Sequence, residues 1–417
     1  MAKSKSINMD SDEIIIVKTN EFTLGKSINV DKVLNPGGSC TVVGDFQPQE
    51  KGNQGLTATF RFTESDDVVC STKLTSVKGG LPVGDQFVVI VGYYQDEPSY
   101  KNEILRGKEL KPYDPRKTFT FKHNTAVRMA KIAWNREYQY VYVGKEGAIS
   151  VVELKPKNDS LTPSGKKVES ATANYLQHVI WNDDLSHYIA VGNAGTIIWS
   201  KNGYDWNLAE EIPLTSDLYD ISWSSQLKLY VAVGKKGAIL TSTNGKTWQQ
   251  QTSPTQNDIY AVTRGDLRGR YVAITYAGDY QNGILTSSDG ITWNHKPNVL
   301  NTGAKVWNSV TWGTKAASFV AVASNRYVAW SADGLDWTSK QLSQRAFTDS
   351  RGANFHFIKV RWTDVLEGNF LAVGQGFCTF FSKDGRTWND FTSTNTTSAD
   401  FGSNASFTDV AGIIMSP

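Results

Sequence analysis

The side chains that could perform acid–base or metal chemistry are scattered through the sequence. None of the five histidines shows the i, i+4 or Cys/His spacing of a zinc site, so we expect no metal and no cofactor. His178 and His187 could meet across neighbouring strands, although two separate surface histidines are the favoured interpretation. No Gly-x-Ser-x-Gly elbow or Walker loop is present. The five histidines are His123, His178, His187, His295 and His356.

The cysteines and the net charge do not indicate a metal-binding, disulfide-rich or nucleic-acid-binding protein. Cys40, Cys70 and Cys378 fit neither a metal motif nor a disulfide-rich scaffold. A Cys40–Cys70 bridge stays open, and free buried thiols are the favoured alternative. With 43 Lys and Arg against 41 Asp and Glu, the chain of 417 residues carries a net charge of +2 and has no basic block. We therefore expect no nucleic-acid partner.

Targeting signals are also missing from the sequence as given. The polar start MAKSKSINMDSDE has no apolar core of the kind that a signal peptide needs. The longest apolar run, QFVVIVGYY at 86–94, is much shorter than the roughly 20 residues that span a bilayer. We expect a protein made in the cytoplasm without a signal peptide and not inserted in a membrane.

A heptad that occurs five times indicates how the chain is built. Each copy reads Ser, any residue, Asn or Asp, Gly, two further residues and Trp. Asn-Gly or Asp-Gly between strands predicts a type I′ hairpin turn, with positive φ at both central residues. We expect each Trp to bury roughly 150–250 Å² and to join one sheet to its neighbour. The turn residues are Asn202, Gly203, Asn244, Gly245, Asp289, Gly290, Asp333, Gly334, Asp384 and Gly385, and the tryptophans are Trp206, Trp248, Trp293, Trp337 and Trp388.

Three strands are expected before each heptad: a short one usually ending in Trp, an apolar one such as YIAVG (188–192), and a third such as GAILTS (237–242). The apolar strand reads as buried on both faces. Four-stranded sheets covered on both sides are the blades of a β-propeller. Six units lie near 129–170, 178–215, 218–255, 259–300, 307–345 and 358–392, and the first lacks its heptad. A closing strand at 406–416 either completes a six-bladed ring or begins a seventh blade finished from around residues 116–123.

The first part of the chain differs in composition. All thirteen tryptophans lie between Trp134 and Trp388, and the region before them is rich in short Val-, Ile-, Thr- and Phe-containing runs. We expect an all-β protein with two domains. Residues 1–125 form a β-rich attachment domain, sandwich-like or barrel-like, and residues 126–417 form the propeller.

The five heptads, in register with matching strands, resemble the Asp-box, or bacterial neuraminidase repeat. The resemblance covers roughly two-thirds of the chain, although the turn here is one residue shorter than in the commoner box. It implies a propeller in which the box is a folding element remote from the active face. The resemblance leaves the function open, since the repeat occurs in sialidases, lectin-like binders, assembly factors and virion proteins.

Enzymatic activity of the sialidase kind would need an arginine triad, an activated Tyr and an acid/base carboxylate. The Arg-Ile-Pro signature of those enzymes is absent, and the arginines do not recur at equivalent positions. Arg361 lies on a strand expected to line the channel, and we interpret it as paired with a carboxylate such as Asp364. The tripeptide at 264–266, Arg-Gly-Asp, is interpreted as a chance match to an adhesion motif.

Recognition by loops and aromatic side chains is the remaining possibility. The connections between blades are long and polar, and Tyr276, Tyr280, Trp330 and Phe377 could offer aromatic surface, although packing between blades is the favoured alternative. We therefore expect a non-enzymatic structural or binding protein, a virion component such as a phage tail, baseplate or decoration protein. Its propeller would bind neighbouring subunits or a host-surface glycan. The alternatives are a sialidase-like glycoside hydrolase and an assembly factor for a membrane complex.

Overall fold

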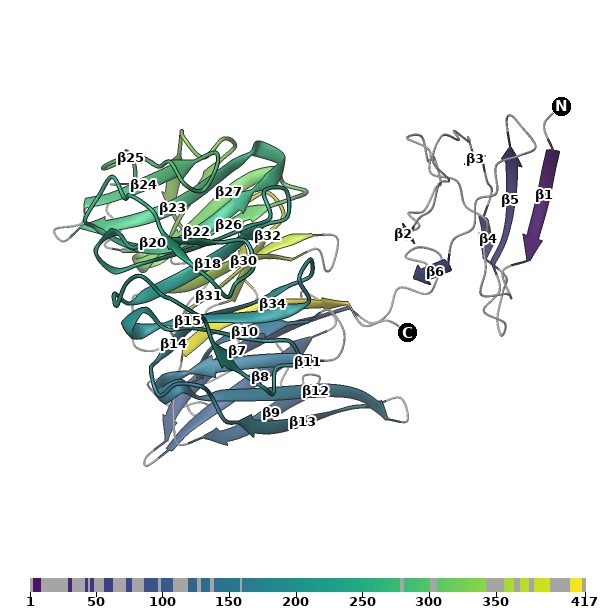
Figure 1. Cartoon of the computed structure of the whole chain (residues 1–417), viewed down its shortest axis with the longest axis horizontal. Helices are drawn as coiled ribbons and strands as arrows, with labels where there is room; N and C mark the ends of the chain where they lie inside the picture. Colours follow the sequence, from purple (N-terminus) through teal and green to yellow (C-terminus); the bar gives the residue numbers. More distant parts are fainter. Residues whose placement is uncertain are drawn as a thin grey trace. The chain divides into compact units, whose positions relative to one another are not determined.

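A computed structural model gives the fold of the chain (Figure 1). Backbone and side chains are described for residues 131–133, 135, 139–153, 166–276, 282–300, 306–342, 356–363, 368–374, 379–389 and Asp409. The other strands named below are described by backbone pairing alone. Cys40, Cys70, Cys378, Tyr280, Asp364 and Phe377 lie outside the described residues.

The chain divides into two compact units, Met1–Asp85 with the last two residues, and Gln86–Met415. The first unit is β-rich, as expected, and contains two sheets. One sheet holds β1 (Lys3–Asn8), β3 (Val42–Val43), β4 (Phe46–Pro48) and β5 (Leu56–Phe62), and the other pairs β2 (Asn29–Asp31) with β6 (Lys73–Ser76). The expected strand at 14–19 lies outside the described residues.

The second unit is a β-propeller, and its first six blades are consecutive four-stranded antiparallel sheets, as the sequence predicts. We call the strands of each blade A to D from the axis outward. Blade 1 is β10 (Met129–Trp134), β11 (Gln139–Gly144), β12 (Ile149–Lys157) and β13 (Ser160–Val168). Blade 2 is β14 (Leu176–Asn182), β15 (His187–Gly192), β16 (Ile197–Ser200) and β17 (Asn207–Leu208). Blade 3 is β18 (Leu218–Ser224), β19 (Leu229–Gly234), β20 (Ile239–Ser242) and β21 (Gln249–Gln250).

Blades 4 to 6 repeat this arrangement. Blade 4 is β22 (Asp258–Gly265), β23 (Arg270–Ala277), β24 (Gln281–Ser287) and β25 (Asn294–Lys296). Blade 5 is β26 (Trp307–Gly313), β27 (Ser318–Ala323), β28 (Tyr327–Ser331) and β29 (Thr338–Gln341). Blade 6 is β30 (Phe357–Thr363), β31 (Asn369–Gly374), β32 (Thr379–Ser382) and β33 (Asn389–Asp390).

A seventh four-stranded sheet closes the ring and shifts the expected domain boundary. It consists of β34 (Ser406–Ile414), β7 (Gln86–Asp96), β8 (Ser99–Gly107) and β9 (Phe119–Thr125), in that order. Its inner strand β34 lies beside β30 on one side and β10 on the other (Figure 1). The tail therefore begins a seventh blade, which was the alternative to a six-bladed ring. The domain boundary lies before Gln86 rather than at 125, because the apolar run at 86–94 is strand B of this blade.

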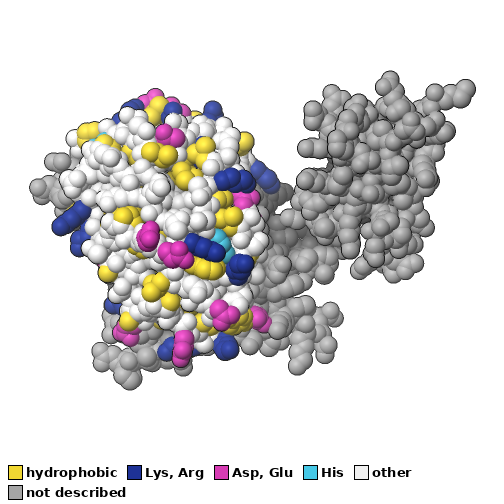
Figure 2. All heavy atoms as spheres, in the orientation of Figure 1, with side chains coloured by type: hydrophobic (Ala, Val, Ile, Leu, Met, Phe, Trp, Pro, Cys, Tyr) yellow, Lys and Arg dark blue, Asp and Glu magenta, His cyan; other side chains and the backbone are white. Residues whose placement is uncertain are grey.

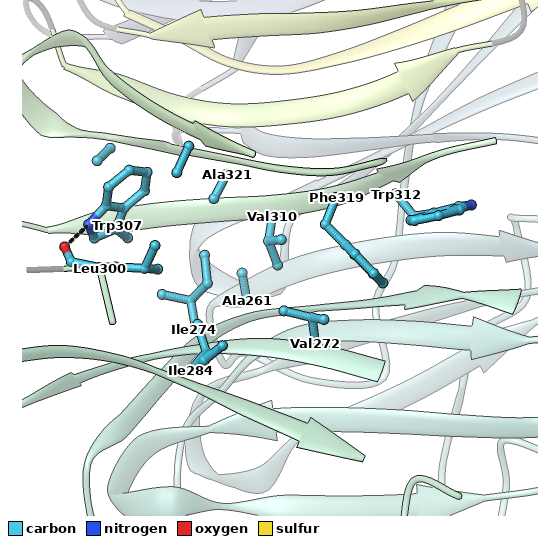
Figure 3. Packing of buried hydrophobic residues seen from close by; sticks show 12 residues of the cluster. Ala261, Val272, Ile274, Ile284, Leu300, Trp307, Val310, Trp312, Phe319 and Ala321 are labelled. Carbon is cyan, nitrogen blue, oxygen red and sulfur yellow. Dashed lines mark hydrogen bonds between the residues drawn. The ribbon is translucent and has the colours of Figure 1, made fainter. Parts of the chain in front are cut away.

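Packing between blades forms the core. Figure 3 shows Val272, Ile274 and Ile284 of blade 4 meeting Val310 and Phe319 of blade 5, all of them buried. Every residue of strand β27 is buried, so side chains on both faces of this strand are covered by neighbouring sheets. Each fully buried Val, Leu, Ile or Phe contributes roughly 1.5–3 kcal/mol relative to exposure. The blades hold together mainly through this apolar packing.

Antiparallel blades place their connections at two opposite ends of the ring. The A–B loops and the heptad turns lie at one end, which we call the A–B face, and the B–C turns lie at the other, the B–C face. Short 3-10 turns occupy the B–C turns η1 (Lys145–Gly147), η2 (Asn193–Gly195), η3 (Lys235–Gly237) and η5 (Ser324–Arg326), and the A–B loop of blade 4 holds η4 (Asp266–Arg268). In the described part of the chain, no helix has the length and apolar character needed to cross a membrane.

Candidate functional site

The axis of the propeller is the first place where chemistry-bearing side chains gather. The innermost strands β10, β14, β18, β22, β26, β30 and β34 are each paired within their sheet on one side only. The free edge of such a strand presents backbone N–H and C=O groups that need other partners. We therefore expect side chains around the axis to serve first as hydrogen-bond partners for these free strand edges.

One position recurs on all seven inner strands. Each strand carries a one-residue bulge, and the first paired residue after the bulge faces an equivalent residue of strand B. We call these residues the axial ring. Its members are Lys131, His178, Asp220, Ala261, Ser309, Lys359 and Asp409. Six of the seven are polar or charged, so the axis of this propeller is lined by a ring of mixed charge.

The Arg361–Asp409 pair joins blades 6, 7 and 1. The Arg361 guanidinium donates through Nε to Oδ1 and through Nη2 to Oδ2 of Asp409, both at 2.7 Å. The same carboxylate accepts the backbone N–H of Ile132 at 3.2 Å, while Nη2 donates to the Ile132 carbonyl at 3.2 Å. Asp409 is fully buried, and such bidentate pairs are the strong form of ion pair. Ring closure thus has a polar clamp at the axis.

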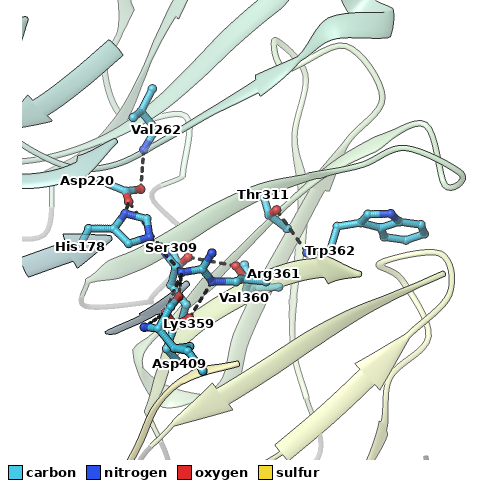
Figure 4. A network of polar contacts seen from close by, with 11 residues as sticks. His178, Asp220, Val262, Ser309, Thr311, Lys359, Val360, Arg361, Trp362 and Asp409 are labelled. Carbon is cyan, nitrogen blue, oxygen red and sulfur yellow. Dashed lines mark hydrogen bonds and ion pairs between the residues drawn. The ribbon is translucent and has the colours of Figure 1, made fainter. Parts of the chain in front are cut away.

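A second carboxylate, Asp220, joins blades 2, 3, 4 and 6 (Figure 4). Its Oδ2 accepts the backbone N–H of Val262 at 3.0 Å, and its Oδ1 lies 3.5 Å from Lys359 Nζ and in contact with His178 Nδ1. Asp220 and Asp409 therefore cap the same backbone position of the next blade. Neither carboxylate is left to interact with solvent, because both are buried.

His178 is held in one neutral form. Its Nε2 lies 3.0 Å from Nη2 of Arg361, which can only donate, so Nε2 accepts and the proton sits on Nδ1 towards Asp220. Burial lowers the pKa of His178 to about 4, against the opposing effect of Asp220. Burial acts to raise the pKa of Asp220, but His178 and Lys359 hold it well below its usual value. Both ring nitrogens are therefore engaged at neutral pH.

Lys131 adds a further cation to the axial ring. Burial lowers its pKa to about 8, although Asp409 acts in the opposite direction. Burial likewise acts to raise the pKa of Asp409, and Arg361 holds it well below its usual value. Charges of opposite sign are thus paired within the axial ring and with Arg361. The contacts of the axial ring are ion pairs and hydrogen bonds between inner strands of different blades, so they hold these strands together.

The five heptad turns form a second repeated arrangement, with nearly identical hydrogen bonds. In the blade 3 copy, Ser242 Oγ accepts the N–H of Gly245 at 2.8 Å, and Asn244 Oδ1 accepts the N–H groups of Lys246 and Thr247 at 2.8 and 3.0 Å. The indole Nε1 of Trp248 donates to the Gly245 carbonyl at 3.1 Å. The same four contacts occur in the other copies.

This geometry corrects the expected type I′ turn. Only the glycine has positive φ, from 74° to 81° over the five copies, and the preceding Asn or Asp does not. The side-chain oxygen of that Asn or Asp instead accepts two following N–H groups, which makes the loop longer than a two-residue hairpin: strand C of blade 2 ends at Ser200 and strand D begins at Asn207. Burial acts to raise the pKa of Asp289, Asp333 and Asp384, and these N–H groups lower it.

The heptad tryptophans lie between neighbouring blades. Trp248 packs in a cluster with Ile189 and Val191 of blade 2 and Leu240 of its own blade. Trp206, Trp248 and Trp293 are buried, while Trp337 and Trp388 are half-buried. Each turn therefore fixes the outer part of one sheet to strand B of the sheet before it.

A family model described as the DUF6242 β-propeller domain matches residues 157–412. The chain belongs to this family. The family's description names the propeller alone, and neither the Asp-box repeat nor a phage origin is part of it. No curated protein matches the sequence.

The similarity of this chain to solved structures carries no argument about its function. A structure titled "YCF48 bound to D1 peptide" is 14% identical, with a TM-score of 0.49, and the match covers 70% of this chain and 93% of that one. In total 1063 chains of solved structures match this chain.

The structure of this DUF6242 propeller agrees with some of the expectations for Arg361 and the histidines and differs from others. Arg361 lies at the axis and pairs with a carboxylate, but its partner is Asp409. His178 and His187 are both buried, not on the surface, and they do not meet, because Val191 rather than His187 faces His178. His187 Nε2 lies 2.9 Å from the Tyr230 hydroxyl of the next blade.

The Arg-Gly-Asp tripeptide is not presented to a partner. The Arg264 side chain is buried, forms an ion pair with Asp266 at 2.9 Å, and lies 4.7 Å from the centroid of the Tyr271 ring. Trp330 packs against the core between blades 5 and 6. Packing between blades is the interpretation that the sequence favours for this residue, over an aromatic binding surface. Within the described residues, no group of three or more His, Cys, Asp or Glu side chains is placed to hold a metal ion.

The axial ring was missed by sequence reasoning. Its signal was available, since the ring position is the third residue before the end of the motifs HVIW, DISW and KVRW. Aligning those motifs with FTDVAG at 407–412 would have placed Asp409 in the ring beside Arg361. The apolar run QFVVIVG at 86–92 similarly resembles the strand B sequences, which would have revealed the seventh blade.

The two faces of the ring differ in what they expose. Five large apolar residues are exposed in the described part of the chain, and four of them lie in turns of the A–B face over blades 2 to 4. These are Leu185 (37% exposed), Leu227 (39%), Leu267 (75%) and Ile291 (50%). The fifth, Leu208, lies on the outer strand of blade 2. Figure 2 shows charges of both signs dispersed among apolar atoms on the propeller surface in view.

Proposed function

We propose that this protein is a non-enzymatic binding protein whose propeller docks onto a protein partner, as a component of a particle such as a bacteriophage tail, baseplate or head decoration. The observation that carries the proposal is the row of exposed apolar side chains on the A–B face. Leu185, Leu227 and Leu267 occupy the A–B loops of three consecutive blades.

Their arrangement favours a protein contact over chance exposure. Single exposed leucines are normal on protein surfaces, but a set repeated over adjacent loops is typical of an interaction site. The half-buried Trp223 lies between two of these loops, and its Nε1 donates to Asp184 of the preceding blade at 2.7 Å. A partly exposed tryptophan beside apolar side chains is consistent with a protein interface, because aromatic residues are enriched there.

The axial ring supports a role other than glycoside hydrolysis. A glycoside hydrolase needs one carboxylic acid that stays protonated near neutral pH, which requires a raised pKa. The pKa values of Asp220 and Asp409 are both lowered despite the opposing effect of burial, that of Asp220 by His178 and Lys359 and that of Asp409 by Arg361. His178 has no free nitrogen to act as a base.

Replacing the three leucines of the A–B loops with aspartate tests the proposal. The full-length chain carrying Leu185→Asp, Leu227→Asp and Leu267→Asp is compared with the unaltered chain in affinity purification from the native source, with quantitative mass spectrometry. We expect a protein partner to be retained by the unaltered chain and reduced at least about ten-fold by the three aspartates, the effect of losing roughly 1.4 kcal/mol of binding. Leu208→Asp, at an exposed site on the outer strand of blade 2 and away from these three loops, is the control and should retain the partner.

Further measurements separate the finer alternatives. Co-sedimentation of the chain with a purified particle is expected if it is a virion component. Turnover of a sialidase substrate would overturn the non-enzymatic assignment. Binding on a glycan array that survives the three aspartates would replace the protein partner with a surface glycan. Recovery of the same partner by the unaltered and triple-aspartate chains would disprove the role of the A–B face.

A further inference from the structure

Three tyrosines form a continuous aromatic patch at the opposite, B–C end of the propeller. Tyr219 and Tyr260 are the bulge residues of strands A in blades 3 and 4, and Tyr276 lies on strand B of blade 4, opposite Asp258. Ring centroids are 5.4 Å apart for Tyr219 and Tyr260 and 5.9 Å apart for Tyr260 and Tyr276. We call these three rings the tyrosine patch.

The rings are arranged as an open ladder. The interplanar angles are 31° and 32°, so the rings do not surround a central space as the walls of a box would. All three side chains are half-buried, which leaves part of each ring accessible. In the adjoining blades 2 and 5 the bulge residues are Gln177 and Asn308. The Gln177 side chain donates to Asn193 Oδ1, and the Asn308 side chain donates to the Phe357 carbonyl.

Two carboxylates, Asp258 and Asp217, lie beside the tyrosine patch. Asp258 accepts the backbone N–H of Lys236 with Oδ1 at 2.8 Å, and no lysine or arginine within the described residues pairs with this carboxylate. Asp217 is the next carboxylate, and it forms an ion pair with Lys235 at 3.7 Å. Burial raises the pKa of Tyr219 to about 12, with further contributions from Asp258 and Asp217, and burial and Asp258 also raise that of Tyr260. A cation placed against these rings would be stabilised by Asp258, which forms no ion pair with a lysine or arginine among the described residues.

The protein uses the same chemistry internally. Arg264 lies 4.7 Å from the centroid of the Tyr271 ring, and Lys166 lies 5.5 Å from that of Tyr204, whose hydroxyl donates to Glu153 at 2.6 Å. A cation over a tyrosine with a carboxylate beside it is therefore a combination that this fold accommodates. Among the described residues, no cation of the chain itself is recorded over the three rings of the tyrosine patch.

We propose that the tyrosine patch, with Asp258 at its rim, binds an arginine side chain of a basic segment in a partner protein. A guanidinium is planar and can stack on an open aromatic face while donating two hydrogen bonds to one carboxylate. A compact ammonium is better matched to an aromatic cage, which these inclined rings do not form. The site is on the other face from the leucine row, and its occupancy does not depend on the proposed function of that row.

Peptides of matched length test the chemistry. A capped tetra-arginine peptide and its tetra-citrulline counterpart are titrated into the full-length chain at about 150 mM salt, where long-range attraction is largely screened. We expect arginine to bind at least about ten-fold more tightly than the neutral citrulline isostere, and more tightly than tetra-lysine. Equal affinity for arginine and citrulline, or no binding of arginine at millimolar peptide, would overturn the proposal.

Substitutions locate the site. Tyr219→Leu and Tyr260→Leu should weaken arginine binding about ten-fold, and Asp258→Asn by several-fold, while Tyr260→Phe keeps the ring and most of the affinity. Tyr204→Leu, which removes a half-buried tyrosine on the other face, is the matched control and should bind as the unaltered chain does. If the leucine variants fail to fold, the phenylalanine and asparagine variants still decide the matter. Unchanged binding in Asp258→Asn would contradict the proposal, as would displacement of arginine by neutral oligosaccharides.

Discussion

At the scale of single residues, the axial ring shows how a buried charge set is made tolerable. The fully buried Asp409 carboxylate accepts hydrogen bonds from two donors of Arg361 and from the backbone N–H of Ile132. Burying a charge without such partners costs many kcal/mol. The ring therefore specifies how the inner strands align, because any other register would leave these charges unpaired.

Acidification should destabilise the propeller between about pH 6.5 and pH 4. Burial lowers the pKa of both His178 and His187 to about 4, so the unfolded chain takes up protons first as the pH falls. Their contribution is complete above pH 6.5, is lost progressively on the way down to pH 4, and amounts to at most about 3 kcal/mol per histidine. Urea midpoints measured from pH 7.5 to pH 4 check this expectation.

The paired variant His178→Asn with His187→Asn is the control for this pH dependence. It should be less stable at pH 7 but show a flatter profile between pH 6.5 and pH 4. A slope in that interval as steep as that of the unaltered chain would show that other groups cause the acid sensitivity. Asp220 and Asp409, whose pKa values are lowered, would contribute only at lower pH.

The Arg361–Asp409 clamp should behave as a coupled pair. Asp409→Asn or Arg361→Met alone is expected to cost about 3 kcal/mol, because each leaves a buried charge without its partner. The double variant should cost clearly less than the two single changes together, and chemical denaturation of all four proteins measures that coupling. Additive effects would mean that the two side chains act independently. The exposed Lys228–Asp184 pair offers a comparison in which Lys228→Ala changes stability by less than about 1 kcal/mol.

At the scale of the elements, the heptad turn acts as a clip between sheets. Its serine and its Asn or Asp satisfy the N–H groups of the turn, which leaves the glycine free to approach strand B of the preceding blade. A Cβ added at Gly245 would lie 2.2 Å from Ile189 Cδ1. The glycine is therefore required both by its positive φ and by the close approach of the neighbouring blade.

Gly245→Ala should cost about 2–4 kcal/mol. The left-handed backbone, with φ of 74°, contributes about 1–2 kcal/mol and the collision with Ile189 contributes the remainder. Gly269→Ala is the matched control, because its φ is 63° but no atom lies within 4 Å of the added Cβ, so about 1 kcal/mol is expected. Denaturation midpoints of the two variants decide the matter. Equal losses would show that contact between blades plays no part.

At the scale of the whole molecule, the ring is closed by strands from opposite ends of the propeller unit. Strand β34 pairs with β7, so Asp409 faces Val91 across the sheet. This pairing completes a blade from two segments that neither could form alone. The closure then holds β30 and β10 on either side of β34 through packing and the Arg361–Asp409–Ile132 contacts.

Deleting residues 406–417 should open the ring. The deletion removes the inner strand of the seventh blade together with Asp409, so we expect a large drop in melting temperature and a broader, less cooperative transition. Adding a synthetic peptide of residues 404–417 should restore part of the loss, as calorimetry would show. Deleting residues 1–85, which belong to the other compact unit, should leave the main transition nearly unchanged. A full-stability protein without residues 406–417 would refute this view of closure.

Much of the propeller could be predicted because its signals are local. The apolar B strands, the glycines of the heptads and Trp248 each report their own surroundings through hydrophobic pattern and turn chemistry. Six consecutive blades and their contacts through tryptophan followed from these features. The turn type was predicted wrongly, because the bonding of Asn244 Oδ1 to two later N–H groups depends on the conformation that the turn adopts.

The sequence by itself determined which segments become buried strands and where each blade turns. Only the tertiary structure decided which sheet a strand joins and which polar groups meet at the axis. His178 and Arg361 are 183 residues apart, and no local pattern records that they bond. The run at 86–94 likewise reads as a buried strand in any context, and its place in the seventh blade is set by β34. The physical reason is that burial is encoded by each residue's own chemistry, whereas pairing depends on the closure of the whole ring.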